Sequence, residues 1–323
     1  MNIYFAPLEG ITGYIFRKAY SGIYGHVDKY FTPFIAPSEK CPMTSRERKD
    51  VDPGNNEGLI LVPQILTNRS DCFIDAAKEL KGMGYREINL NLGCPSGTVC
   101  AKGKGAAFLP ETIELKRFLD DIYNYASATD TKISIKTRLG YYHPDEFYDL
   151  VKIFNGYPVS ELIVHPRIRS DFYKGDVRTE YYAYALENSK CPLVYNGNIF
   201  TKEDYDELSK LFHNNPDPVM LGRGLVSDPS LAGKLKGSTA TTDYAKFRQF
   251  HDTLYHEYRK VMSPDINVLH KMRELWSYWQ VLFEGCERDI KKVMKAKKYK
   301  EYEDVVSHVL ISDPSRLSFA DLS

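Results

Sequence analysis

The chain has 323 residues, of which 43% are hydrophobic, and its 43 basic and 43 acidic residues give a formal net charge of zero at pH 7. This length is enough for one large domain, or for a large domain with a smaller one. The balanced charge excludes a generally basic nucleic-acid-binding protein, although a local basic patch remains compatible with it.

The cysteines are scattered along the chain and form no Cys-x-x-Cys pair. They are Cys41, Cys72, Cys94, Cys100, Cys191 and Cys286. This usage argues against a disulfide framework or a structural zinc site, so we expect no metal and a reducing, cytoplasmic location. The opening "MNIYFAPLEG" lacks the basic and apolar regions of a secretory signal, and no apolar run reaches the roughly 18 residues of a membrane-spanning helix.

Short apolar runs alternate with longer stretches of helical spacing through the first part of the chain. The predicted strands cover 2–10, 27–37, 58–66, 85–93, 132–140, 160–167, 191–199 and 217–224. The predicted helices cover 12–24, 70–83, 111–126, 144–155, 178–187, 202–213 and 228–235. Eight such units in about 235 residues predict a (β/α)8 TIM barrel. The alternative is an open doubly wound sheet, but its glycine-rich fingerprint is missing from "APLEGITG" after the first strand.

Beyond about residue 240 only helical spacing is found. We therefore predict a barrel domain over 1–238 and a smaller all-helical domain over 239–323. The run "RDIKKVMKAKKYK" at 288–300 concentrates basic charge between the helices of this second domain. The stretch 38–56 is long, polar and charged, which predicts a loop that is either mobile or functional.

Polar side chains stand at the end of nearly every predicted strand, which is where barrels of this kind carry out chemistry. These residues are Gln64, Asn89, Asn91, Lys136, Arg138, His165, Arg167, Asn196 and Asn198. Any one of them alone can be a turn cap, a snorkelling lysine or a loop histidine. A purely structural barrel does not need the whole set, because an unpaired buried polar group costs about 1–3 kcal/mol. The set therefore indicates a ligand site on one rim.

The last two predicted strands end in glycine turns, "NGN" at 196–198 and "GRG" at 222–224. Their backbone N–H groups, with Arg223, suit a phosphate, which barrels commonly bind after strands seven and eight. Across the rim, Gln64 and Lys136 can bond a flat heterocycle, and a lysine near N1 of a flavin stabilises the anionic reduced ring. This pattern suggests FMN.

Taken together, the motifs resemble the bacterial-type tRNA-dihydrouridine synthase family. The resemblance rests, in chain order, on "APLEG", "PQIL", "NLNLGCPSGTVCAKGKGAAF", "IKTRLG", "VHPR", "YNGNI" and "LGRGLVSDP". It runs through most of the chain. Two departures occur: Pro166 and Ile168 replace the family's usual small residue and threonine, and "GAAFL" lacks leucines that often follow the glycine and alanine.

The resemblance implies an FMN enzyme that reduces a specific uridine of tRNA to 5,6-dihydrouridine with NADPH as electron donor. It further implies that Cys94 gives a proton to C5 after hydride reaches C6 from flavin N5, and that Asn91 contacts the uracil. A monomer without a membrane or an obligatory protein partner is expected. The residues implied to contact FMN are Pro7, Leu8, Glu9, Gln64, Lys136, His165, Asn196, Gly197, Asn198, Gly222 and Arg223.

The chemistry fits these assignments. A thiol with an ordinary pKa of about 8.5 keeps its proton at neutral pH, so Cys94 suits a general acid, with Cys100 as the competing thiol. Arg138, His165 or Arg167 can stabilise charge that develops on the uracil carbonyls.

RNA contacts are expected in two places. Lys102 and Lys104 lie in the glycine-rich loop after Cys94 and can meet phosphates of the substrate. The basic run at 288–300 is predicted to hold the tRNA through shape and phosphate contacts.

Three alternatives remain open from the sequence. The first is an FMN barrel oxidoreductase that acts on a free pyrimidine, similar to dihydroorotate or dihydropyrimidine dehydrogenases. The second is a non-catalytic RNA-binding protein on a degenerate barrel. The third and weakest is a flavin-free phosphate-sugar isomerase, for which no acid–base carboxylate pair is found.

Overall fold

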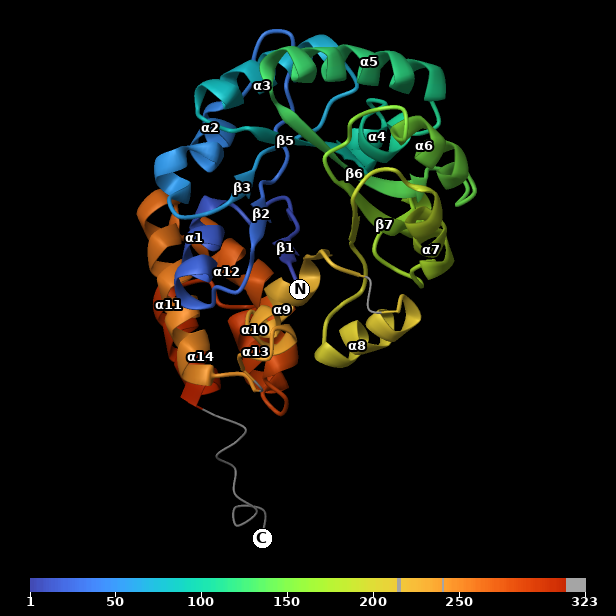
Figure 1. Cartoon of the computed structure of the whole chain (residues 1–323). Helices are drawn as coiled ribbons and strands as arrows, with labels where there is room; N and C mark the ends of the chain where they lie inside the picture. Colours follow the sequence, from blue (N-terminus) through green and yellow to red (C-terminus); the bar gives the residue numbers. More distant parts are fainter. Residues whose placement is uncertain (214–215, 240, 312–323) are drawn as a thin grey trace. The chain divides into compact units, whose positions relative to one another are not determined.

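A nearly closed barrel of parallel strands forms the centre of the computed structural model, which describes residues 1–213, 216–239 and 241–311 (Figure 1). The strands are β1 (Ile3–Phe5), β2 (Lys29–Phe31), β3 (Leu61–Val62), β4 (Gln64–Ile65), β5 (Glu87–Leu92), β6 (Lys132–Gly140), β7 (Leu162–Ile168), β8 (Leu193–Tyr195) and β9 (Val219–Leu221). They are hydrogen-bonded in the order β3-β2-β1-β9-β8-β7-β6-β5-β4.

The sheet closes because its two end strands come from one predicted strand. Pro63 separates β3 from β4, and a proline has no N–H to give to a ladder. β3 pairs with β2 and β4 pairs with β5, so this interrupted strand joins both ends of the sheet. The predicted TIM barrel is thereby confirmed, and the open doubly wound sheet is excluded.

Helices follow the strands as the sequence predicts. They are α1 (Tyr14–Ile23), α3 (Ser70–Gly82), α5 (Thr112–Thr129), α6 (Glu146–Phe154), α7 (Thr179–Asn188) and α8 (Lys202–Leu211). Figure 1 shows α3, α5, α6 and α7 outside the strands. Their apolar residues recur at helical spacing, so each presents one buried face and one polar face.

The prediction of a loop over 38–56 is wrong for its second half, which forms α2 (Ser45–Val51) and the short helix η1 (Pro53–Asn56). A capping box starts α2: Glu47 N–H donates to Thr44 Oγ1 at 3.3 Å, and Thr44 N–H donates to Glu47 Oε2 at 2.7 Å. The pattern Thr-x-x-Glu that signals this box is present in the sequence, within a stretch whose polarity otherwise favours a loop.

The two ends of the barrel differ in character. At the N-terminal ends of the strands, Lys29 Nζ lies 3.1 Å from Glu87 Oε2 and 2.9 Å from Glu161 Oε2, and the Tyr4 hydroxyl donates to Glu161 at 2.6 Å. These contacts engage the charged groups at that end with one another. Ligand sites of such barrels lie at the opposite end, where the strands finish.

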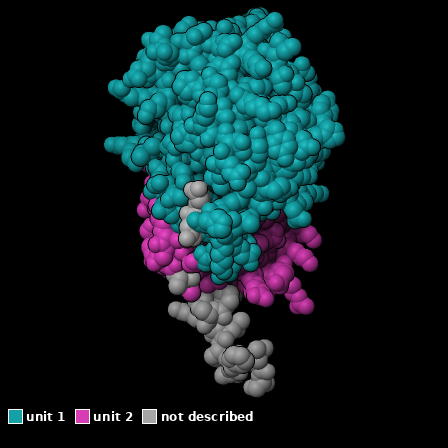
Figure 2. Space-filling model, turned by 45° about the vertical axis from the view of Figure 1, so that its right-hand side comes forward, with its two compact units in different colours: residues 1–14, 27–199, 203–221 teal, residues 15–26, 200–202, 222–323 magenta. Residues whose placement is uncertain are grey.

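The chain divides into two compact units (Figure 2). One consists of 1–14, 27–199 and 203–221 and contains all nine strands. The other consists of 15–26, 200–202 and the described residues from 222 onward, so it includes α1 as well as the C-terminal helices. These helices are α9 (Arg223–Ser227), α10 (Leu231–Leu235), α11 (Tyr244–Val261), α12 (Asp265–Trp279), α13 (Glu287–Val293) and α14 (Tyr299–Ile311). The domains 1–238 and 239–323 stay a prediction.

Aromatic rings fill the core of the helical unit. Phe250 meets the rings of Phe16, Tyr20 and Tyr24 edge to face at 5.4 to 6.2 Å, and Phe247 meets Trp279 in the same way at 5.2 Å.

The prediction that the basic run 288–300 lies between helices is wrong for most of the run. That part belongs to α13 and to the start of α14. Within the described ranges, every helix is too short or too polar to span a bilayer.

Candidate functional site

A chain of buried amides crosses β4, β5 and β6. Asn91 Nδ2 donates to Gln64 Oε1 at 2.7 Å, and Gln64 Nε2 donates to Asn89 Oδ1 at 2.8 Å. Asn89 Nδ2 then donates to Ser134 Oγ at 3.0 Å. Gln64, Asn89 and Ser134 are register partners on neighbouring strands, which places them side by side. Each amide is thus held in one orientation, and Gln64 keeps a second hydrogen and a second lone pair for a ligand.

Asn91 also fixes the turn that carries Cys94. Its Oδ1 accepts the backbone N–H groups of Gly93 at 3.0 Å and Cys94 at 2.9 Å. The residue predicted to contact uracil therefore already bonds three groups of the protein, with one Nδ2 hydrogen left. The thiol of Cys94 is half-buried, and this burial raises its pKa, so the thiol stays protonated over a wider pH range.

The loop after Cys94 folds back onto it through α4 (Gly97–Cys100) and η2 (Gly105–Phe108). Gly105 has φ +61, and a Cβ there would lie 2.8 Å from the Cys94 carbonyl oxygen, so no other residue fits. The Cys100 thiol donates to the same carbonyl at 3.6 Å, which gives the competing thiol a structural partner. Lys102 is exposed and Lys104 half-exposed on this loop.

The amine of Lys136 on β6 has no partner among the described residues. In the described part of the chain, no hydrogen bond or ion pair engages its Nζ. Burial, and next the charge of Arg138, lower its pKa to about 7. An ammonium in such a place gains strongly from an acceptor or anion brought by a ligand.

The two arginines predicted to contact substrate bond the protein itself in this structure. Arg138, almost fully buried, donates to the carbonyl oxygens of Gly93 at 2.8 Å, Ile168 at 3.0 Å and Phe172 at 2.6 Å. It therefore joins the Cys94 turn to the segment that follows β7. Burial lowers its pKa to about 10, so it stays charged at neutral pH.

Arg167 has a similar position on β7. It donates to Asn198 Oδ1 at 3.1 Å and to the carbonyl of Gly175, and it lies 3.2 Å from His165 Nε2. His165 is itself buried at the end of the strand. Arg167 thereby links His165, the turn after β8 and the segment after β7, so its structural role is to position these three.

The turns after β8 and β1 complete the rim of the barrel unit. Asn196 Nδ2 donates to the carbonyl of Met220 at 2.7 Å, and a Cβ on Gly197 would lie 2.6 Å from the Tyr195 hydroxyl. After β1, Leu8 N–H donates to Thr12 Oγ1 at 2.8 Å, with Pro7 half-buried and Glu9 exposed.

Gly222 and Arg223 belong to the helical unit. Gly222 precedes the first turn of α9, and the guanidinium of Arg223 lies 5.3 Å from the ring centroid of Phe200. Their predicted contact with a phosphate stays a prediction.

Two participants were missed from the sequence. Ser134 ends the amide chain, and nothing distinguishes it from an ordinary strand serine. Tyr173 stacks on His165 with ring centroids 6.4 Å apart, and Arg138 lies 5.5 Å from its ring. An aromatic residue shortly after the "HPRIR" motif is a weak signal that sequence reasoning did not use.

Comparison with known proteins identifies the family. The family model described as dihydrouridine synthase matches residues 4–310. The chain belongs to the dihydrouridine synthase family. The resemblance found in the motifs is thereby confirmed, and membership makes the chain one of a family of enzymes.

Named relatives agree with this assignment, and one solved structure shares the fold. The chain is 30% identical over 240 residues to the tRNA-dihydrouridine(16) synthase of Pseudomonas syringae pv. tomato, covering 73% of the chain and 74% of that protein. It is 28% identical over 279 residues to the probable tRNA-dihydrouridine synthase of Staphylococcus epidermidis, covering 84% and 83%. A variant of NCR from Zymomonas mobilis superimposes with a TM-score of 0.52 at 14% identity, covering 75% of this dihydrouridine synthase and 88% of that structure, which supports the shared fold alone.

Proposed function

We propose that this dihydrouridine synthase reduces a uridine of tRNA to 5,6-dihydrouridine, with FMN as its cofactor and NADPH as its electron donor. The observation that carries the proposal is that a protonated thiol and an amine without a partner among the described residues both belong to the β5–β6 side of the barrel. Cys94 sits on a turn fixed by Asn91, and Lys136 projects from the neighbouring strand. The printed names of the relatives support tRNA as the substrate.

The residues at the rim fit FMN. Lys136 lacks a partner in the described residues, and Gln64 retains one donor and one acceptor, which suits the carbonyl and ring nitrogens of a flavin. Gly197 allows the turn between Asn196 and Asn198 to pack against the Tyr195 ring, where a Cβ would not fit, and backbone N–H groups of such a turn suit a phosphate. When bound and reduced, FMN supplies the hydride that uracil receives at C6.

The protein supplies the proton. Hydride addition at C6 of the conjugated ring leaves negative charge shared between C5 and the C4 carbonyl. The Cys94 thiol forms the new C–H bond at C5 by giving up its proton, and the resulting thiolate regains a proton from solvent. The raised pKa of this thiol keeps the acid form present at neutral pH. Arg138 holds Cys94 in place through the carbonyl of Gly93.

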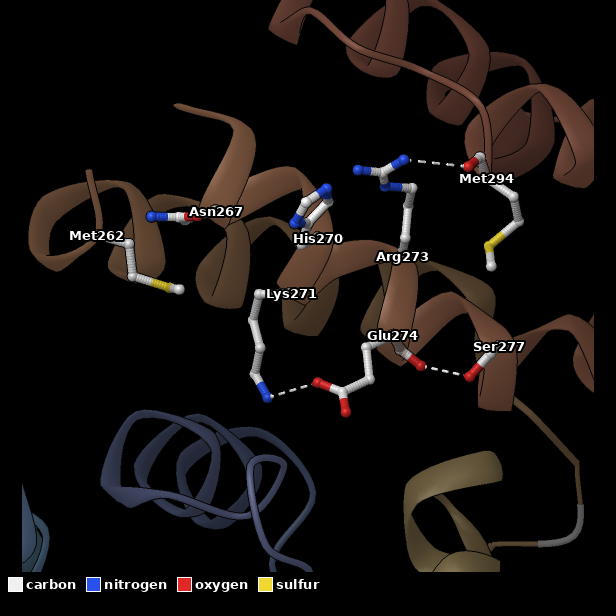
Figure 3. A pocket seen from close by; sticks show the side chains of 8 residues that line it. All are labelled: Met262, Asn267, His270, Lys271, Arg273, Glu274, Ser277 and Met294. Carbon is white, nitrogen blue, oxygen red and sulfur yellow. Dashed lines mark hydrogen bonds and ion pairs between the residues drawn. The ribbon is translucent and has the colours of Figure 1, made fainter. Parts of the chain in front are cut away.

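The helical unit offers the RNA-binding surface. An open groove of about 660 Å³ runs along α12, where it is lined by His270, Lys271 and Arg273, with Met262 and Met294 on either side (Figure 3). Arg273 is half-buried and brings positive charge to this groove. Phosphate contacts dominate affinity for nucleic acid, so this guanidinium suits an RNA phosphate.

The decisive experiment uses tRNA from cells that lack this gene. We expect incubation with the FMN-loaded protein and NADPH to add two hydrogens at one uridine, mapped by mass spectrometry. Two relatives are named for position 16, which makes this the first position to inspect. Cys94→Ala should abolish the gain and Cys100→Ala should retain most of it, because only Cys94 is assigned the proton.

Two results would reject the proposal. If free uracil or dihydroorotate reacts and tRNA does not, the chain is a small-molecule flavoenzyme. If Cys100→Ala loses the reaction while Cys94→Ala keeps it, the proton donor is misassigned even though the reaction is correct. FMN content, measured from the absorbance of each purified variant, separates loss of chemistry from loss of cofactor.

A further inference from the structure

Aromatic rings gather around Arg169 at the C-terminal ends of β6 and β7. We call Tyr141, Tyr142, Arg169 and Phe172 the aromatic platform. Tyr142 is 63% exposed and Phe172 is 41% exposed. The Arg169 guanidinium lies 5.6 Å from the Tyr141 ring centroid and 5.1 Å from that of Phe172, while Tyr141 and Tyr142 meet edge to face at 4.7 Å. The platform thus combines flat apolar surface with a positive charge.

Hydrogen bonds from backbone N–H groups to two carboxylates hold the platform in place. Glu146 accepts the backbone N–H groups of Tyr141 at 2.9 Å, Tyr142 at 2.8 Å and His143 at 2.7 Å. On the other strand, Asp171 accepts the N–H of Ile168 at 2.9 Å. Rings on a fixed backbone lose little freedom when a ligand stacks on them, so this arrangement favours binding.

Phe172 has a strained backbone conformation. Its φ is +49, a region that residues other than glycine rarely adopt. The Arg138 bond to its carbonyl and its own N–H bond to the carbonyl of Arg169 at 3.2 Å keep it there. Because the ring is partly exposed, burial does not compensate for the strain, and such outliers cluster at ligand-binding segments.

Arg169 brings an unpaired positive charge to the platform. The residue is half-buried and forms no ion pair within the described residues. Its guanidinium is therefore held between rings with its charge uncompensated. A partner that offers both a π-face and a phosphate oxygen satisfies both needs, and a nucleotide is such a partner.

The platform is connected to the candidate site by one residue. Arg138 bonds the carbonyl of Phe172 and also that of Gly93, which adjoins Cys94. A nucleotide on the platform would accordingly be next to the one that reaches Cys94. A uridine can reach the thiol only when it leaves its stack, and this also deprives the neighbouring base of its stacking partner.

We propose that the aromatic platform stacks an unpaired base of the tRNA adjacent to the uridine that is reduced, with Arg169 contacting the linking phosphate. This inference rests on the proposed function and names a new contact surface for the same substrate. The platform replaces the stacking that the neighbouring base loses, so it favours the flipped-out state of the target uridine.

The test compares ring removal with ring retention. We expect the double variant Tyr142→Ala, Phe172→Ala to bind fluorescently labelled tRNA about tenfold more weakly. Tyr142→Phe with Phe172→Tyr keeps both rings and should bind like the unmodified protein. Ile113→Ala, which removes a 67% exposed side chain on α5, is the control for loss of exposed apolar surface. FMN content should be equal in all four proteins.

A substrate change makes the test specific for the neighbouring base. A synthetic tRNA fragment with an abasic nucleotide next to the target uridine, on either side, should lose affinity for the unmodified protein. The ring-removal variant should not distinguish it from the intact fragment. Two results would show that the platform does not stack that base. In the first, the ring-removal variant loses as much affinity for the abasic fragment, relative to the intact one, as the unmodified protein does. In the second, the ring-removal variant binds intact tRNA as tightly as the unmodified protein.

The outcomes separate this inference from the proposed function. Unmodified protein that neither binds nor reduces tRNA rejects both. Normal reduction of tRNA by the ring-removal variant, with normal KM, rejects only the platform. Dissociation of a dimer on ring removal, with unchanged tRNA affinity, rejects it in favour of a protein interface.

Discussion

Lys136 illustrates how one residue's chemistry depends on its surroundings. Its side chain is half-buried near the charge of Arg138, and burial first of all lowers its pKa to about 7. An exposed lysine is fully charged at neutral pH, whereas this one gives up its proton more readily. A flavin acceptor atom beside it favours the ammonium form, so binding must take up a proton when the pH lies above this pKa.

We therefore predict that FMN binds the cofactor-free protein more weakly as the pH rises from 7 to 9. The affinity should fall by up to about tenfold per pH unit, because protonation of Lys136 becomes part of the binding reaction. Quenching of FMN fluorescence gives the affinity, and calorimetry in two buffers gives the proton uptake. Lys136→Gln should bind more weakly at pH 7 and with a flat pH profile; an unchanged slope in this variant would assign the dependence to another group.

Other single residues show what a linear pattern can and cannot reveal. Asn91 and Arg138 were recognised as polar residues at strand ends, which alternation along a strand makes visible. Their bonds to Gln64, Ile168 and Phe172 are not predictable in this way, because they depend on which strands lie next to each other and on the path of the chain after β7. The rim could thus be predicted from the sequence, whereas the division between residues that bind a ligand and residues that hold the loops could not.

At the scale of elements, the strands and most helices follow from local pattern alone. β6 coincides with its predicted range of 132–140, because a buried strand there is flanked by clear turn residues. Very short elements are not predictable from periodicity. The helix α9 has five residues and α4 has four, which is too few for a periodic signal. The pairing of β3 with β2 and β4 with β5 is a non-local property and was not predictable from Pro63 alone.

Packing in the helical unit joins three elements through one buried histidine. Trp276 Nε1 on α12 donates to the Tyr302 hydroxyl on α14 at 2.9 Å, and that hydroxyl lies 2.7 Å from His251 Nε2 on α11. Burial lowers the pKa of His251 and favours its neutral form, in which Nδ1–H donates to Asp252 at 2.8 Å and Nε2 accepts from the Tyr302 hydroxyl. This relay requires His251 to be neutral.

We predict that the helical unit loses stability as the pH falls below about 6.5, the ordinary pKa of histidine. Burial lowers the pKa of His251, so the unfolded chain takes up a proton before the folded protein does. The stabilisation is complete above the unfolded pKa and is lost as the pH falls through the lowered one. The only two tryptophans of the chain, Trp276 and Trp279, are buried here, so their fluorescence during thermal unfolding reports on this unit.

His251→Gln should lower the melting temperature at pH 7.5 and remove most of its decline between pH 6.5 and 5. His256→Gln is the matched control, because His256 lies on the same helix and is exposed. An equal decline with pH in the unmodified protein and in His251→Gln would show that other groups, such as paired carboxylates, control acid sensitivity.

For the whole molecule, a net charge of zero conceals an uneven distribution. Many surface lysines are neutralised locally: Lys78, Lys152 and Lys260 each pair with an acidic residue three positions away. In the basic run, Lys292 pairs with Asp289 in the same way. Lys291, Lys295 and Lys298 are exposed and form no ion pair in the described part of the chain. The molecule therefore keeps uncompensated positive charge on α13 and the turn after it.

We predict that this charge holds tRNA through its phosphates. The triple variant Lys291→Gln, Lys295→Gln, Lys298→Gln should bind tRNA more weakly and reduce the slope of log affinity against log salt by about 2–3, since each lost phosphate contact removes roughly 0.7–0.9. Lys78→Gln, Lys152→Gln, Lys260→Gln changes the net charge equally but removes paired lysines, so its slope should remain close to that of the unmodified protein. Equal losses in both triple variants would mean that overall charge, not this surface, determines affinity. Because neither set of lysines adjoins Cys94 or Lys136 in the sequence, turnover at saturating tRNA should stay unchanged in both, which separates RNA capture from the chemistry on the barrel rim.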